Sequence, residues 1–274
     1  MNILLIIGNG FDKNLGLKTG YSDFIESPQF LSLIDQNNDL SKYLMSKNEL
    51  EKWIDIENEL KIYSIQIFKD NNRDKFKKDY QDLCNALCHY INGIDYNEMS
   101  RDSDAYERIS GVLNSYESVE VLDFNYTESI DNIIYVMGVD TKKIKHIRVH
   151  GSAKEKNIIF GVEDGARINP NDSFLQKSYN DNYCVLVKDS LKSANDILVY
   201  GHSLGDTDHS YFEPFFKNQI IPKVSDRKKI SITYYSENGK DDVFKQLNEL
   251  TGRRIGVLRE LNDFKSIPLP KYKR

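Results

Sequence analysis

Short apolar runs that end at glycine or polar turns recur through this chain, several of them continuous, and they constrain its fold more than any other feature. A strand that is covered on both faces has no solvent side, so a continuous apolar run is typical of a parallel sheet. The runs are Ile3 to Ile7, Val119 to Leu122, Ile144 to Val149, Ile197 to Tyr200, Ile230 to Tyr235 and, as a last member, Ile255 to Leu258. They predict a doubly wound α/β fold with a mainly parallel, Rossmann-like sheet.

The segment between the first two runs is far longer than one crossover helix needs. It contains two sets of apolar residues at helical spacing. The sets are Trp53, Ile56, Leu60, Tyr63 and Ile67, and then Phe76, Tyr80, Leu83, Leu87 and Ile91. We therefore expect residues 1–274 to form a single α/β domain in which residues 28–117 are a helical insertion after the first strand.

The composition narrows the class of protein. A content of 39% hydrophobic and 29% charged residues indicates a globular chain, and no apolar run approaches the roughly 20 residues of a membrane span. Basic residues are scattered and the net charge is −5, which argues against a nucleic-acid surface. Three cysteines make neither a disulfide framework nor a four-cysteine zinc site. We expect a soluble, cytoplasmic protein without a membrane partner.

The turn GNGFD, residues 8–12, follows the first apolar run directly. Its two glycines allow a tight turn and a close approach to a ligand, and a helix starting near Asp12 would aim free N–H groups at that ligand. The third glycine of G-x-G-x-x-G is missing, so the pattern is half of a dinucleotide fingerprint. Because the Asp12 carboxylate would repel a phosphate, we expect a sugar hydroxyl beside it, with an ordinary helix N-cap as the alternative.

Two further turns end strands at the edge where open α/β sheets collect ligands. FNYT, residues 124–127, offers Asn125 to a ribose hydroxyl, although an asparagine that ties a turn is the simpler interpretation when the motif is taken alone. VHG, residues 149–151, offers His150 as a base or hydrogen-bond partner near pH 7. A histidine that is satisfied within its own loop is the alternative there.

The stretch GHSLG, residues 201–205, fits the G-x-S-x-G turn that carries the serine nucleophile of α/β-hydrolases. In those enzymes the catalytic histidine follows the serine from a late loop. Here the one histidine after Ser203 is His209, six residues further on. A triad in that order cannot be completed, so we interpret Ser203 as a ligand-binding hydroxyl.

Taken together and in this order, GNGFD, FNYT, HG and GHSLGDTD resemble the AbiH family of bacteriophage abortive-infection proteins, as does the WxDxE segment of Trp53, Asp55 and Glu57. That family is in turn similar to sirtuin-like, NAD-handling proteins. Sirtuins carry GAGxSxxxGI where Gly8, Gly10 and Gly16 stand, an asparagine at the place of Asn125, a histidine and glycine at His150 and Gly151, and GTSL or GSSL at Gly201 to Leu204. The cysteine count excludes the zinc module of sirtuin deacylases, so the resemblance implies binding or cleavage of NAD.

On this resemblance the catalytic residues would be Asn125, which orients the ribose or the attacking water, and His150, which bonds or deprotonates a ribose hydroxyl. Gly8, Asn9, Gly10 and Phe11 would line the pyrophosphate and nicotinamide side, Gly201, His202 and Ser203 the adenosine side, and Asp12 and Asp208 complete the cofactor-binding set. Glu57, on the inward edge of its predicted helix, would be a better candidate carboxylate than Asp55, although a capping or salt-bridged glutamate is the simpler interpretation. The implied partners are a nucleotide and a phage-derived trigger or partner protein, an oligomer is left open, and no metal is expected.

Two other functions remain open. His202, Asp206, Asp208 and His209 cluster within eight residues and could hold a metal ion in a nuclease, although Asp206 and Asp208 more simply cap a helix that starts at His209 or Ser210. The chain could also sense a nucleotide without cleaving it.

Overall fold

The computed structural model describes residues 2–51, 55–67, 72–179, 184–221 and 227–270. The chain divides into two compact units. The sheet unit consists of Met1–Leu17, Tyr96–Val149 and Tyr183–Arg274, and the helical unit consists of Lys18–Asp95 and His150–Asn182.

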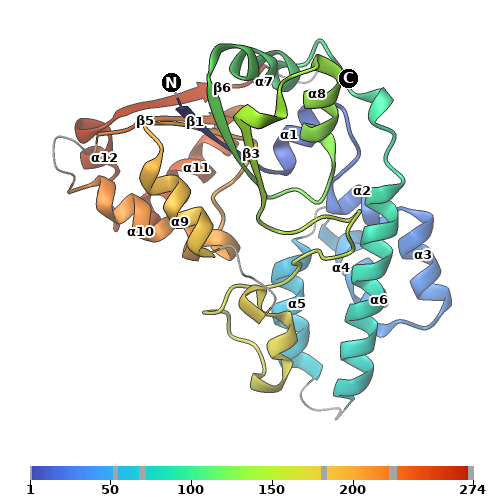
Figure 1. Cartoon of the computed structure of the whole chain (residues 1–274). Coiled ribbons are helices and arrows are strands. Elements are labelled where there is room, and N and C mark those ends of the chain that lie inside the picture. The colour runs from blue at the N-terminus through green and yellow to red at the C-terminus, as the bar shows by residue number, and fades with distance from the viewer. Residues whose placement is uncertain (1, 52–54, 68–71, 180–183, 222–226, 271–274) are drawn as a thin grey trace. The chain divides into compact units, whose positions relative to one another are not determined.

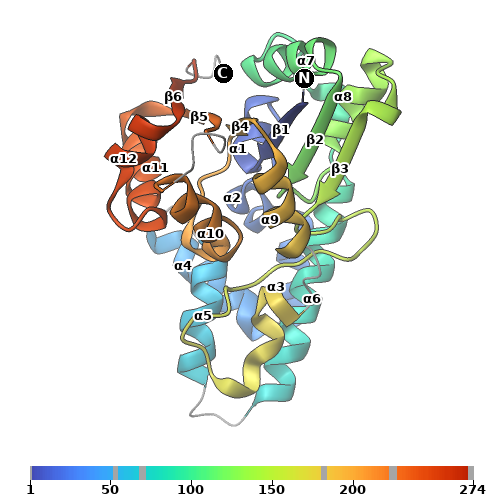
Figure 2. The same cartoon turned by 60° about the vertical axis from the view of Figure 1, so that its left-hand side comes forward.

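The sheet unit contains six strands that pair in parallel throughout. They are β1 (Asn2–Ile7), β2 (Ser118–Asp123), β3 (Ile144–Arg148), β4 (Asp196–Tyr200), β5 (Lys229–Tyr234) and β6 (Asp263–Pro268). Their order across the sheet is β3-β2-β1-β4-β5-β6, so the direction of winding reverses between β1 and β4 (Figures 1 and 2). The predicted doubly wound, Rossmann-like fold is confirmed.

The predicted last strand, Ile255 to Leu258, is wrong. These residues open the helix α12 (Ile255–Leu261), in which Leu258 is fully buried. A run of four apolar residues does not distinguish a strand from a short buried helix. The sixth strand is β6, whose residues DFKSIP are half-buried or exposed, as suits a strand at the edge of a sheet.

Helices cover both faces of this sheet. One layer consists of α9 (Cys184–Ser193), α10 (His209–Gln219), α11 (Ser236–Leu250) and α12, and the other consists of α1 (Asn9–Asn14), α7 (Asp104–Ser115) and α8 (Ser129–Met137). Leu4 and Ile6 of β1 join a core cluster with Phe212 of α10 and Leu247 of α11. Because side chains alternate along a strand, the equally buried Leu5 and Ile7 face the other layer. Short 3₁₀ turns complete the unit at η2 (Tyr96–Glu98), η3 (Thr141–Lys143) and η6 (Asp206–Asp208).

The helical unit contains α2 (Tyr21–Ile25), α3 (Pro28–Asp35), α4 (Asp39–Glu51), α5 (Ile56–Gln66) and α6 (Arg73–Asn92), followed by the 3₁₀ turns η4 (Pro170–Leu175) and η5 (Lys177–Tyr179). The stripe predicted for α6 is confirmed, because all five of its apolar residues are buried. Cys88, beside that stripe, is buried, and Cys84 is half-buried. The other predicted helix begins later than expected, since Asp55 caps α5 by accepting a bond from the amide of Asn58 at 3.2 Å. Trp53 lies outside the described residues.

The predicted insertion, residues 28–117, corresponds to α3 through α7. Of these helices, α7 belongs to the sheet unit, and residues 150–182 join the other four in the helical unit. The organisation as a single domain stays a prediction. Every helix in the described ranges is too short or too polar to cross a lipid bilayer.

Candidate functional site

The strand register brings three of the predicted turns to one edge of the sheet. Ile7, the last residue of β1, pairs with Asp123 of β2 and with Tyr200 of β4. The turns GNGFD, FNYT and GHSLGDTD therefore begin just beyond the same row of the sheet, at its carboxyl edge. Hydrogen bonds join them in pairs: the Asn125 side chain donates to the carbonyl of Gly8 at 3.2 Å, and the amide of Gly10 donates to the carbonyl of Gly201 at 2.8 Å.

The glycines of these turns are required by the fit of one turn against the other. Gly201 has φ +64°, and a Cβ atom built on it would lie 2.2 Å from the amide nitrogen of Phe11. A Cβ atom on Gly10 would lie 2.8 Å from the Cα of Gly201, and one on Gly8 would lie 2.9 Å from the Cα of His202. The amide of Gly8 also donates to the carbonyl of Tyr200 at 3.2 Å. The backbone amides of Gly8 and Gly10 are thus both bonded within the protein.

The side chains of the same turns divide into inward and outward groups. Phe11 is fully buried and packs edge-on against Tyr200, with ring centroids 5.8 Å apart. Asn9 and Ser203 are exposed. The polar groups that these two turns present outward therefore include an amide from the first turn and a hydroxyl from the second.

His202 is a fixed part of the interior. It is buried, its Nδ1 accepts a bond from the amide of Leu204 at 2.9 Å, and its Nε2 lies 3.3 Å from a carboxylate oxygen of Asp208. Because Nδ1 accepts, the ring proton sits on Nε2 and points to Asp208. Because both ring nitrogens of His202 are engaged in this way, His202 is not placed to act as the base for Ser203, which agrees with the interpretation of Ser203 as a binding hydroxyl.

Asn125 ties the edge together. Only 5% of it is exposed, and besides the side-chain bond to Gly8 its backbone N–H donates to Oδ1 of Asp123 at 2.9 Å. Asp123 is the last residue of β2 and is fully buried. The predicted turn-tying role of Asn125 is therefore present, and its predicted catalytic role stays a prediction.

Asp12 points into the protein. It is fully buried on α1, with one carboxylate oxygen accepting a bond from the Ser129 hydroxyl at 2.5 Å and the other from the Thr127 hydroxyl at 2.7 Å. Burial raises the pKa of Asp12 to about 7, with the two hydroxyl bonds opposing this rise and the charge of Asp123 adding to it. Its carboxylate is directed at these hydroxyls, so the repulsion of a bound phosphate that the sequence suggested loses its basis.

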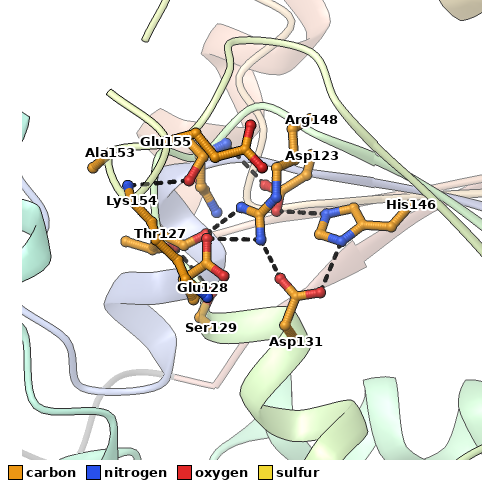
Figure 3. A network of polar contacts seen from close by, with 12 residues as sticks. Asp123, Thr127, Glu128, Ser129, Asp131, His146, Arg148, Ala153, Lys154 and Glu155 are labelled. Carbon is orange, nitrogen blue, oxygen red and sulfur yellow. Dashed lines mark hydrogen bonds and ion pairs between the residues drawn. The ribbon is translucent and has the colours of Figure 1, made fainter. Parts of the chain in front are cut away.

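A network of charged side chains, centred on two residues of β3, lies beside this edge (Figure 3). His146 sits between Asp123 and Asp131, with one ring nitrogen 3.1 Å from each carboxylate. Burial acts to lower the pKa of His146, but the bonds and charges of the two aspartates outweigh it and raise it to about 9. Arg148 donates to the carbonyl of Thr127 at 2.9 Å and pairs with Glu128 and Asp131.

This network holds the FNYT turn and the start of α8 against β3. The sequence pattern did not predict this network, because its members stand inside a predicted strand and just after a turn motif. The one available signal was the three basic residues of KHIR, residues 145–148, which are unusual for a strand covered on both faces.

His150 belongs to the helical unit, where it is buried and its carbonyl accepts a bond from the amide of Ile159 at 2.8 Å. Gly151 follows with φ +74°, and a Cβ atom there would lie 2.2 Å from the carbonyl oxygen of Asn157, so both the backbone conformation and the space favour glycine. The role of His150 as a base stays a prediction. Glu57, in the same unit, is buried and pairs with the buried Lys177 at 3.1 Å, as its salt-bridge interpretation suggested.

The four residues of the candidate metal site separate into two groups. His202 and Asp208 form the buried pair described above. Asp206 and His209 instead approach Glu249 at the end of α11, and one ligand atom from each of these three lies within 4.8 Å of the others. Asp208 precedes α10 as expected, but its side chain makes no capping bond.

The strand order and the three interlocked turns define a doubly wound, Rossmann-like protein whose polar carboxyl edge lies at the reversal of the winding. The profile of the family described as "Bacteriophage abortive infection AbiH" matches residues 4–234, which run from within β1 to the end of β5. The chain belongs to this family. Its role is accordingly in abortive-infection defence against bacteriophage. A search of curated proteins found no match.

Proposed function

We propose that this AbiH protein defends its host by binding NAD or a related nucleotide at the carboxyl edge beside β1 and β4 and by hydrolysing the nicotinamide–ribose bond. One observation supports the location above all: GNGFD and GHSLGDTD interlock where the strand order reverses. Open α/β sheets bind their ligands outside the carboxyl ends of the strands at such a reversal. The similarity to sirtuin-like proteins, stated from the motifs, supplies the identity of the ligand and is part of the proposal.

The contacts refine how the nucleotide is held. Because the amides of Gly8 and Gly10 are bonded to β4 and its turn, they do not form a phosphate cradle. We assign the recognition of sugar and phosphate oxygens to the exposed side chains of Asn9 and Ser203, one on each turn.

In the hydrolysis, water adds to the anomeric carbon of the ribose and nicotinamide leaves with the electron pair of the broken bond, through an oxocarbenium-like state. Asn125 orients the ribose or the water, and its fixed position between Gly8 and Asp123 suits that task. A general base takes up the proton that the attacking water loses. A phage-derived trigger starts the reaction.

The test is Asn125→Ala, with Asn2→Ala as the matched control, because Asn2 is exposed at the opposite end of β1. NAD and free nicotinamide are measured in infected cells and with purified protein exposed to extract of infected cells. We expect wild type and Asn2→Ala to release nicotinamide and Asn125→Ala to lose about 100-fold or more of the rate. If wild type blocks the phage while NAD stays intact, the hydrolytic proposal fails.

A nucleotide sensor without catalysis is the nearest alternative, since the same edge would serve it. Calorimetry with NAD decides between them: binding by wild type without release of nicotinamide, with or without infected extract, favours the sensor. Absence of both binding and release removes NAD from the proposal.

The cluster of Asp206, His209 and Glu249 favours a cation-dependent nuclease as the second candidate. Metal analysis of purified protein, and a nucleic-acid cleavage assay with and without chelator, test it. Cleavage that the chelator abolishes, and that His209→Ala lacks, would support this candidate over NAD hydrolysis.

A further inference from the structure

The environment of Asp12 is unusual for a residue that would serve only to tie two segments together. Asp12 lies on α1, directly after the GNG turn, and the two hydroxyls that it holds flank Glu128 at the start of α8. Those hydroxyls, of Thr127 and Ser129, lie 3.1 Å from each other. Thr127 is the last residue of the FNYT turn, so Asp12 grips the turn that carries Asn125.

The charged groups around Asp12 do not neutralise it. Asp123 of β2 adds a negative charge and Tyr96 of η2 interacts with Asp12 electrostatically. The nearby cations of β3 have acids of their own: His146 pairs with Asp123 and Asp131, and Arg148 pairs with Glu128 and Asp131. Among the ion pairs of the described ranges, none involves Asp12. A buried carboxylate held by hydroxyl groups alone is costly to keep charged.

We propose that Asp12 is a positioning residue whose grip on the turn of Asn125, through Thr127 and Ser129, changes when the Asp12 carboxylate takes up a proton. The charged carboxylate accepts one bond from each hydroxyl. The protonated carboxyl group carries hydrogen on one oxygen, and that oxygen must donate. The hydroxyl facing it then turns into an acceptor and redirects its own hydrogen to the other hydroxyl, 3.1 Å away, so the group stays hydrogen-bonded and no longer buries a charge.

Because the pKa of Asp12 is higher in the closed turn than the ordinary value of 3.8 that it regains when the turn opens to water, protonation favours the closed turn, which is therefore held more firmly below neutral pH than above it. Burial places the pKa of Asp12 at about 7, so the change falls between pH 6 and pH 8. His146, with its pKa raised to about 9, stays mostly charged over that interval, so its titration contributes little to a change measured between pH 6 and pH 8. For the effect on NAD hydrolysis this inference rests on the proposed function, whereas the effect on the turn rests on the contacts alone.

The first measurement needs only wild-type protein and no activity. Hydrogen–deuterium exchange of the peptide spanning residues 124–129 is compared at pH 6 and pH 8 after correction for the intrinsic rate. One pH unit below the pKa about ten molecules are protonated for each charged one, so we expect protection to be severalfold higher at pH 6 than at pH 8. Equal corrected protection at the two pH values overturns the proposal.

Two variants separate the effect of protonation at Asp12 from the effect of removing a hydrogen-bonding group. Asp12→Asn keeps the size and carries no charge at any pH, so the exchange of 124–129 should no longer depend on pH, whereas the control Asp241→Asn, exposed on α11, should behave as wild type. Thr127→Val removes one of the two gripped hydroxyls and should give low protection at both pH values. A pH dependence that survives in Asp12→Asn assigns the titration to another group and overturns the proposal.

The NAD assay adds the functional arm. We expect the ratio of the wild-type rate to the Asp12→Asn rate to fall severalfold between pH 6 and pH 8, since the Asp12→Asn rate carries any pH dependence that comes from other groups. If exchange responds to pH as expected but NAD is never cleaved, the positioning role stands and the proposed function fails. If NAD is cleaved with one pH profile in wild type and in Asp12→Asn, the positioning role fails and the function stands.

Discussion

Replacing Gly201 by alanine tests whether the glycines of the edge serve the fit of two turns. Gly201 has φ +64°, a conformation that costs an L-residue about 1–2 kcal/mol. The new methyl group would also meet the Phe11 amide nitrogen at 2.2 Å and the Gly10 carbonyl carbon at 2.4 Å. Both are backbone atoms of the neighbouring turn, so they cannot rotate away as a side chain would.

The two costs can be separated with Gly252→Ala. Gly252 also lies in the sheet unit and has φ +58°, but a Cβ atom on it would meet nothing within 4 Å. Gly252→Ala therefore carries the conformational cost alone, about 1–2 kcal/mol. Gly201→Ala adds an overpacking cost of about 1–3 kcal/mol, for a total of roughly 2–5 kcal/mol.

Urea denaturation followed by circular dichroism measures the difference through the unfolding midpoints at a common slope. Hydrogen exchange at the carboxyl ends of β1 and β4 should also rise in Gly201→Ala and stay unchanged in Gly252→Ala. Equal losses of stability in the two variants would refute the reasoning, because they would mean that the turns are not pressed together at Gly201.

Two further predictions use the charged pairs. The folded-state pKa of His146, about 9, is higher than the ordinary value near 6.5. Its contribution to stability, up to roughly 3 kcal/mol, is therefore fully present below about pH 6.5 and is lost as pH rises through about 9. Wild type should lose stability to urea over this range by more than His146→Gln does, and equal losses would contradict the assignment. Lys177→Met leaves Glu57 buried without its partner and should cost about 3–5 kcal/mol of unfolding free energy. The double variant Lys177→Met with Glu57→Leu should recover most of that loss. A double variant as unstable as the single one would show that the ion pair itself contributes the stability.

The fold was largely predictable because the strands of a doubly covered sheet leave a plain signal. Five apolar runs became β1 to β5, since a buried strand needs apolar residues on both faces. The sixth failed for the converse reason. An edge strand such as β6 needs little burial and carries polar residues, whereas IGVL supplies the apolar side of a short helix.

The candidate site was predictable in its position and less so in its contents. Turns after parallel strands must meet at one edge, so the grouping of GNGFD, FNYT and GHSLGDTD followed from the fold class. What Gly10 or Asp12 contacts depends on how two turns interlock, and no spacing in the sequence encodes that. His146 and Arg148 were missed because their importance arises from strand register, which places them beside Asp123 and Thr127.

The central position of β1 sets an order in which the protein can come into being. Synthesis makes β1 first, but its neighbours in the sheet are β2, more than a hundred residues later, and β4, almost two hundred residues later. The GHSLGDTD turn that locks against Gly10 emerges later still. A ribosome must therefore translate about two hundred residues beyond β1 before the edge can assemble, and a chain terminated before that point would carry the motif GNGFD without any working site.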